Sequence, residues 1–216
     1  MEVVMLFQAN IASPVPGQLD NFNSFLLKNL ELAGACGVPA TVKVSSYGTP
    51  SIEIMTLMMF SGWEEHGAKT AEMRAHPMWK KLMEMGGNMP AFADPIDSFV
   101  ASILPGFDTE AKFSEGPILT TVWKPMPGKM SDMLATFHEA KAVHEPHGCM
   151  VRAFQIIGGR YAGCTTYNMS FADDVAYGKC MGSMQADHAE LVSKIEANPN
   201  SEMVAQFKMN NPTIVG

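Results

Sequence analysis

The chain has 216 residues, of which 47% are hydrophobic and 17% are charged, and its formal net charge is −7. This composition provides enough apolar material for a buried core, and the length allows one large domain or two of about 100 residues. An acidic chain without a basic cluster lacks the charge pattern that binds phosphate backbones or anionic membranes, so nucleic acid and membrane partners are not expected.

The N-terminal residues Met1 to Phe7 are apolar, carry no Lys or Arg, and are too few for a signal peptide. No apolar run reaches the ~20 residues of a membrane span. The four cysteines form no Cys-x-x-Cys pair, which is typical of reduced thiols in the cytosol. We therefore expect a cytoplasmic protein.

The spacing of apolar residues predicts the element order βαββα in the first half of the chain. The expected elements are a strand over Val3 to Asn10, a helix over Leu19 to Ala33, strands over Ala40 to Ser46 and Ile52 to Phe60, and a helix over Trp63 to Met85. Turns are expected at the Pro-Val-Pro-Gly segment that starts at Pro14 and at the Tyr-Gly-Thr-Pro segment that starts at Tyr47.

A loop containing Pro90, Pro95, Pro105 and Gly106 is expected to join the two halves, with an additional strand over Ser98 to Leu104. The second half repeats the same pattern. Its expected elements are strands over Ile118 to Lys124 and Ala162 to Phe171, helices over Met130 to Val143 and Asp174 to Glu196, and a counterpart of the additional strand over Val204 to Met209.

The two halves share an internal repeat. The turn that starts at Pro14 recurs as Pro125-Met126-Pro127-Gly128, and the step from Pro14 to Pro125 defines the repeat spacing. Gly37, Gly48, Met58 and Phe60 fall at this spacing on Gly148, Gly159, Met169 and Phe171. Gly and Pro mark backbone positions with special dihedral angles, so their recurrence indicates two copies of one backbone, residues 1–110 and 111–216.

A βαββα unit carries its helices on one face of its sheet, so the other face has to be buried elsewhere. Two units in one chain can bury these faces against each other. We therefore predict an α+β fold in which two tandem ferredoxin-like units form an intrachain, pseudo-dimeric α+β barrel. Such a chain is expected to be a monomer, with or without further homodimerisation.

This architecture resembles the dimeric α+β barrel superfamily, which includes antibiotic-biosynthesis-monooxygenase-like proteins, NIPSNAP-like proteins, stress-responsive A/B barrels, heme-degrading monooxygenases and chlorite dismutases. The local likeness lies in Phe60-Ser61-Gly62-Trp63 and in the segment from Ala71 to Lys81, where a Pro-x-Trp step follows an alanine-rich turn. The second half has Ala186-Asp187-His188-Ala189-Glu190 in place of that step. Because the superfamily hosts many activities, the resemblance implies a fold rather than a reaction.

Trp63, His66, His76 and Trp79 form the first candidate site. Each Trp–His pair is spaced i, i+3 and therefore shares a helix face. The resemblance implies a pocket between helices and sheet, in which His66 and His76 would be catalytic bases and the tryptophans would bind an aromatic ligand. The alternative is that the tryptophans anchor the helix to the sheet and the histidines are half exposed.

His138, His144, Glu145 and His147 offer several potential metal ligands within a short segment. A solvated helix end, with a cationic His near the C-terminal dipole, explains the same pattern, and we expect no metal site. The superfamily also includes heme proteins, which implies His76 or His188 as axial ligand candidates. Surface histidines are the simpler interpretation, and no cofactor is expected.

The second half carries Arg152 and Tyr167 where the first half has Thr41 and Thr56. If such side chains point inward, the second half has a polar interior where the first is apolar. We therefore add Arg152 and Tyr167 as ligand-binding candidates. An outward-facing strand would show the same pattern.

The leading hypothesis is a cofactor-independent monooxygenase, or a related isomerase or cyclase, that acts on a small apolar or aromatic compound. Apolar walls with a few convergent polar groups are typical of such sites. The alternative is a non-catalytic binder of fatty-acid-like or other lipophilic ligands, which would use the 19 methionines as an adaptable lining. A scaffold protein with a filled interior is the third possibility.

Overall fold

The computed structural model describes residues 5–212 apart from residues 50, 109 and 111. The expected strand start at Val3, the turn residue Pro50 and the expected repeat boundary at Ala111 lie outside this part of the chain. In the first half, the elements are β1 (Leu6–Pro14), α1 (Leu19–Ala35), β2 (Ala40–Tyr47), β3 (Ile54–Phe60), α2 (Trp63–Ala75), α3 (Pro77–Asn88) and β4 (Ala93–Ile103). In the second half, they are β5 (Ile118–Pro125), α4 (Met130–His144), the short 3-10 helix η1 (Glu145–His147), β6 (Met150–Ile156), β7 (Thr165–Ser170), α5 (Asp174–Ser183), α6 (Gln185–Ala197) and β8 (Ser201–Asn210).

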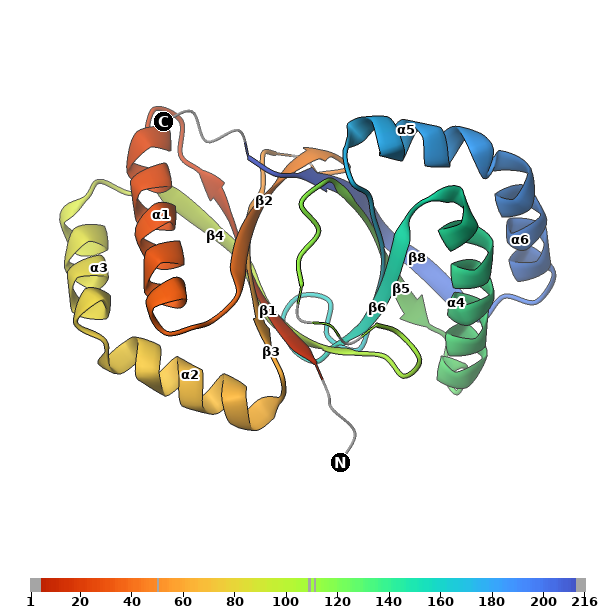
Figure 1. Ribbon diagram of the computed structural model, residues 1–216, viewed down its shortest axis with the longest axis horizontal. Helices are drawn as coiled ribbons and strands as arrows, with labels where there is room; N and C mark the ends of the chain where they lie inside the picture. Colours follow the sequence, from red (N-terminus) through yellow and green to blue (C-terminus); the bar gives the residue numbers. More distant parts are fainter. Residues whose placement is uncertain (1–4, 50, 109, 111, 213–216) are drawn as a thin grey trace.

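The strands form one closed antiparallel barrel in the order β1-β3-β2-β8-β5-β7-β6-β4. Strand β4 pairs with β1 of its own half and with β6 of the other half, while β8 pairs with β5 and β2. These two cross-half pairings close the barrel. Figure 1 shows α1 to α3 outside one side of the barrel and α4 to α6 outside the opposite side. The additional strands expected over Ser98 to Leu104 and over Val204 to Met209 are present as β4 and β8, and both are longer than predicted.

The prediction of one long helix over Trp63 to Met85 is wrong in one respect, because the structure divides this segment at His76 into α2 and α3. Pro77 follows, and a residue before proline is disfavoured in helical conformation, so His76 adopts extended backbone angles. The helix expected over Asp174 to Glu196 is likewise divided, at Met184, whose buried side chain packs into the core.

Pro95, expected in the joining loop, lies instead within β4, opposite Ala12 of β1. The register of the two strands shifts next to this pair. A bulge tolerates proline because one residue there makes no regular ladder hydrogen bond.

Two kinds of core follow from this architecture. One apolar cluster lies inside the barrel, and others lie between the sheet and the helices of each half. Every residue of β3 is buried, because helices cover one face of that strand and the barrel interior covers the other. A strand covered on both faces reads as a continuous apolar run, which is the pattern of Ile54–Phe60.

The segment between β4 and β5 lies partly inside the ring of strands (Figure 1). Arg152 Nη1 donates to the carbonyl of Lys112 at 2.6 Å, and Arg152 Nη2 lies 2.7 Å from the Asp108 carboxylate. From the other half, the buried Lys43 Nζ donates to the carbonyls of Ser114 and Gly116 at 2.8 and 2.9 Å. Two buried cations, one from each half, thus hold this segment in place.

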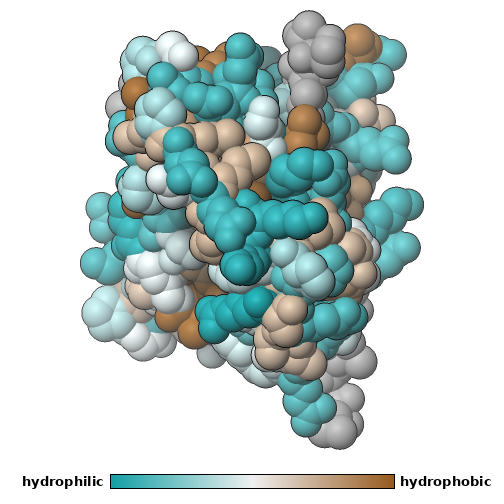
Figure 2. All heavy atoms as spheres, turned by 90° about the vertical axis from the view of Figure 1, so that its left-hand side faces the viewer, coloured by the Kyte–Doolittle hydropathy of each residue, from teal (hydrophilic) through white to brown (hydrophobic). Residues whose placement is uncertain are grey.

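The outer face on the α1–α3 side is predominantly hydrophilic, with apolar residues scattered over it (Figure 2). The apolar residues of these helices instead face the sheet, where Phe22, Leu32 and Leu82 are buried. None of the helices in the described residues is both long enough and apolar enough to cross a membrane.

Candidate active site

One cavity lies between the sheet and the helices of the second half. It has a volume of about 380 Å³, within the range in which small-molecule sites are found. Its wall is mainly apolar and comes from α4, the α5–α6 region and strands β5, β7 and β8. Three side chains with acid–base chemistry also line it, namely Tyr167, His144 and His188.

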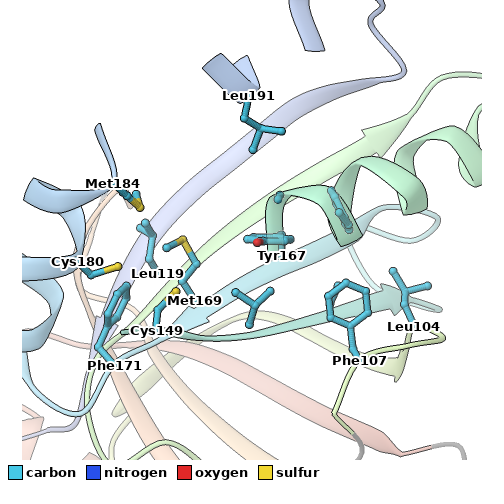
Figure 3. Close-up of a cluster of buried hydrophobic side chains, with 14 of the residues drawn as sticks. Leu104, Phe107, Leu119, Cys149, Tyr167, Met169, Phe171, Cys180, Met184 and Leu191 are labelled. Carbon is cyan, nitrogen blue, oxygen red and sulfur yellow. The ribbon is translucent and has the colours of Figure 1, made fainter. Parts of the chain in front are cut away.

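These three side chains come from three different elements. Tyr167 is on β7 and, because neighbouring strand residues face opposite sides, it points toward the helices while Asn168 points into the barrel. His144 is the last residue of α4, and His188 is on α6. Figure 3 shows Tyr167 within the apolar cluster between sheet and helices, on the same strand as Met169.

The three side chains form a hydrogen-bonded chain. His144 Nδ1 lies 2.9 Å from Tyr167 Oη, and His144 Nε2 lies 3.1 Å from His188 Nδ1. His144 is 4% exposed and Tyr167 is 6% exposed, whereas His188 is exposed. The chain therefore connects a buried phenol to the surface of the molecule.

Burial determines the protonation states of His144 and Tyr167. Burial, together with the nearby His188 and His147, lowers the pKa of His144 to about 4, so its imidazole is neutral at pH 7. Burial also raises the pKa of Tyr167, so the phenol keeps its proton. A neutral His144 can donate from one ring nitrogen and accept at the other, which lets it link Tyr167 and His188.

The described part of the first half does not repeat this hydrogen-bonded chain. At the repeat spacing, the counterparts of His144, Tyr167 and His188 are Ala33, Thr56 and Pro77. On the helix side of that half, aromatic rings fill space: Phe92 packs 5.1 Å from Phe25, measured between ring centroids. The three acid–base side chains that line this cavity thus all belong to the second half.

The four residues of the first candidate site lie in the first half and line neither this cavity nor the barrel interior. The rings of Trp63 and His66 are 5.7 Å apart, as expected for a shared face, and His66 Nε2 lies 3.1 Å from Gln8 Oε1. Trp63 is 51% exposed.

His76 caps α3, because its Nδ1 accepts a hydrogen bond from the backbone N–H of Met78 at 3.3 Å. Trp79 packs, partly buried, on the core of the first half. The anchoring role considered for this tryptophan is therefore present, and the catalytic roles of His66 and His76 stay predictions.

Arg152 and Tyr167, the two ligand-binding candidates of the second half, lie on opposite faces of the sheet. Tyr167 lines the helix-side cavity, and Arg152 lines a second cavity inside the barrel. They cannot contact one small ligand, because the sheet separates them.

The residues considered for a metal site point to different partners. His138 stacks on Phe107, His147 contacts Ser183 and Asp187, and Glu145 pairs with Lys141. Among the described residues, no group of three His, Cys, Asp or Glu side chains is arranged to hold a metal ion.

Heme was considered through the superfamily, with His188 as one axial candidate. His188 does line the cavity, and its hydrogen bond to His144 is of the kind that orients a metal-bound imidazole. The wall contains no Lys or Arg, however, to pair with the two carboxylates of a heme. The side chains that line this cavity therefore do not fit a heme.

From the sequence, His144, Tyr167 and His188 belong to three different candidate sites, and nothing local in the sequence indicates that they contact one another. The signal that could have joined them is the repeat itself. All three are acid–base side chains at positions where the first half has Ala33, Thr56 and Pro77.

No protein-family model matches the chain, and no curated protein matches it. Among solved structures, it resembles a candidate monooxygenase from Fusobacterium nucleatum, with a TM-score of 0.64 and 10% identity over 98% of this chain and 96% of that one. It also resembles a candidate chlorite dismutase (TM-score 0.61, 8% identity, 96% and 94% covered) and an anthrone oxidase-like protein (TM-score 0.56, 9% identity, 97% and 92% covered). At these identities the likeness concerns the fold alone. The chain thus has a mixed α+β fold, and the solved structures that share it are of the dimeric α+β barrel type.

Proposed function

We propose that this protein is a cofactor-independent monooxygenase that oxidises an apolar aromatic compound in the helix-side cavity of its second half. The observation that carries the proposal is the Tyr167–His144–His188 chain in the wall of a mainly apolar cavity. The solved structures with this fold that are described as monooxygenase-like or anthrone oxidase-like support the same reaction class.

Each residue has a distinct role when all the hydrogen bonds point from His188 toward Tyr167 and the cavity. His188 Nδ1–H donates to His144 Nε2, His144 Nδ1–H donates to Tyr167 Oη, and the Tyr167 hydroxyl donates into the cavity. Tyr167 would then stabilise negative charge on a substrate oxygen, as an oxyanion-hole donor does. His188, whose second ring nitrogen remains available, would take the substrate proton, and His144 would position both groups.

The chemistry needs no reductant, because the substrate supplies the electrons. An acidic methylene next to aromatic rings loses a proton to His188, and the resulting carbanion transfers one electron to dioxygen. Recombination of the two radicals and protonation give a hydroperoxide, which loses water to leave a ketone. One oxygen atom ends in the ketone and the other in water.

Anthrone is the probe substrate for this proposal, tested as oxygen uptake by the purified protein with a chelator and without added flavin or heme. We expect turnover by the wild type. Tyr167→Phe should lower kcat by about 10²–10³-fold, as loss of an oxyanion donor does. His188→Gln should lower it by about 10²–10⁴-fold, as loss of a general base does.

His66→Ala and His76→Ala are the matched comparison, because both histidines lie outside the cavity. If these two variants keep full turnover, the catalytic role predicted for them from the sequence is wrong. If they abolish turnover while Tyr167→Phe and His188→Gln keep it, the site belongs to the first half. If oxygen uptake is absent and native mass spectrometry finds a bound lipid, the binder hypothesis replaces the enzyme.

We also propose that the chain arose by tandem duplication of one ferredoxin-like unit, with a boundary near residue 110. Matching elements support this, since the first residues of α1 and α4, of β3 and β7, and of α2 and α5 are each separated by the repeat spacing. Residues 111–216 expressed alone should then form a homodimer by light scattering, with a second copy supplying the missing cross-half strands. A monomer with native circular dichroism would contradict this. The cytoplasmic location stays a prediction.

A further inference from the structure

A second cavity lies inside the barrel, separated by the sheet from the proposed active site. Its volume is about 150 Å³, and most of its wall is aromatic, aliphatic or thioether side chains such as Phe7, Phe99 and Met55. An apolar cavity of about that size accommodates a molecule as large as benzene. One part of the wall, however, is polar.

The polar part is a contiguous patch on three adjacent strands of the second half. Thr120 on β5 is the register partner of Asn168 on β7, which is in turn the partner of Arg152 on β6. Thr166 lies two residues from Asn168 on the same strand and therefore on the same face. All four side chains line the cavity.

Each side chain of the patch keeps one polar atom that has no hydrogen-bond partner in the part of the chain that the structure describes. Thr120 Oγ1, Thr166 Oγ1, Asn168 Oδ1 and Arg152 Nε are each buried and have no partner among the described residues. Arg152, Thr120 and Thr166 are 5%, 4% and 3% exposed. A buried polar atom without a partner costs about 1–3 kcal/mol, and native proteins contain few of them, so four on one wall call for partners beyond the described residues.

Barrel closure does not require polar residues at these positions. In the first half, the equivalent row is Ala9, Leu57 and Thr41, paired across β1, β3 and β2 in the same register. The counterpart of Thr166 is Met55. The same barrel wall is thus mainly apolar in one half and polar in the other.

We propose that the barrel interior is a second ligand site that binds a small monocarboxylate with an apolar body. Arg152 Nε–H is a donor only, so the occupant has to present an acceptor there. The hydroxyls of Thr120 and Thr166 can donate to the same carboxylate, and the amide of Asn168 can turn to do so. The remaining wall surrounds an aromatic or branched aliphatic body.

The charges around the cavity favour an anion over a cation. Lys112, Arg152 and Arg160 line it, with Glu53 as the carboxylate among the lining residues. Asp108 pairs with Arg152 Nη2 and leaves Nε free.

Benzoate is the probe, and benzylamine is the matched cationic control, each titrated into the full-length protein by calorimetry. The double variant Thr120→Ala/Asn168→Leu introduces the residues that the first half carries at these positions. We expect benzoate to bind the wild type and to lose about tenfold or more in affinity in this variant, because two polar contacts disappear. Benzylamine should bind at least about tenfold more weakly than benzoate.

Two further variants keep the test decisive. Thr166→Val changes the shape little and should fold while weakening benzoate binding. Tyr167→Phe alters the other cavity and should leave benzoate affinity unchanged. The proposal is overturned if benzoate binds the wild type and the double variant equally well, or if Tyr167→Phe loses benzoate binding. It is also overturned if the wild type does not bind benzoate at millimolar concentration, or if a crystal structure shows only ordered waters on the four atoms.

Discussion

Lowering the pH should reduce the free energy of unfolding of this protein through His144, because the pKa of this histidine differs between the folded and the unfolded state. Burial lowers the pKa of His144 to about 4 in the folded state, from its ordinary value of 6.5. The unfolded chain therefore binds more protons between these two values. The stability contributed by the neutral imidazole is fully present above pH 6.5 and is lost as the pH falls toward 4.

The size of this effect follows from the two pKa values. Between pH 7.5 and pH 5, linkage predicts that His144 alone removes about 2 kcal/mol from the free energy of unfolding. Urea unfolding of the wild type and of His144→Gln at both pH values measures it, because glutamine does not titrate.

Tyr167→Phe is the control for this experiment. It removes the hydrogen bond to His144 but keeps the imidazole buried, and burial is the main cause of the shift. It should retain the pH dependence of the wild type, and His144→Gln should lack about 2 kcal/mol of it. Equal pH dependence in the wild type and His144→Gln would refute the reasoning.

Two further predictions concern the barrel. Gly48→Ala places a Cβ 2.2 Å from the carbonyl oxygen of Gln206, so it should cost more in unfolding free energy than Gly17→Ala, which has a similar positive φ but open space. The strain common to both is about 1–2 kcal/mol, and equal losses would contradict the clash. Lys43→Met leaves the carbonyls of Ser114 and Gly116 without their donor, at about 1–3 kcal/mol each, and should expose the joining segment to limited proteolysis. Unchanged cleavage would show that Lys43 does not hold this segment.

Local patterns in the sequence were sufficient to predict most of the elements. Each β–α–β–β order and the additional strands follow from apolar spacing and from the Gly and Pro positions that recur at the repeat spacing. The divided helices were missed for different reasons. Pro77 marks the break after α2 in the sequence and was overlooked, whereas the break at Met184 has no such signal.

The sequence predicted only some of the residues that form each candidate site. Tyr167 and Asn168 are neighbours in sequence, but the strand directs one to the helices and the other into the barrel. When both faces of a strand are buried, residue type does not reveal which side chains point to the helices and which point into the barrel. His144 and His188 are 44 residues apart, and the packing of α4 against α6 brings them together.

The repeated order of elements follows from local sequence, because propensity, periodicity and turn residues act over a few neighbouring positions. Which side chains share a cavity depends on tertiary packing, because barrel closure and helix packing bring together residues far apart in the chain. This is why Arg152 and Tyr167 separate into two cavities, while His144, Tyr167 and His188 form one chain of hydrogen bonds.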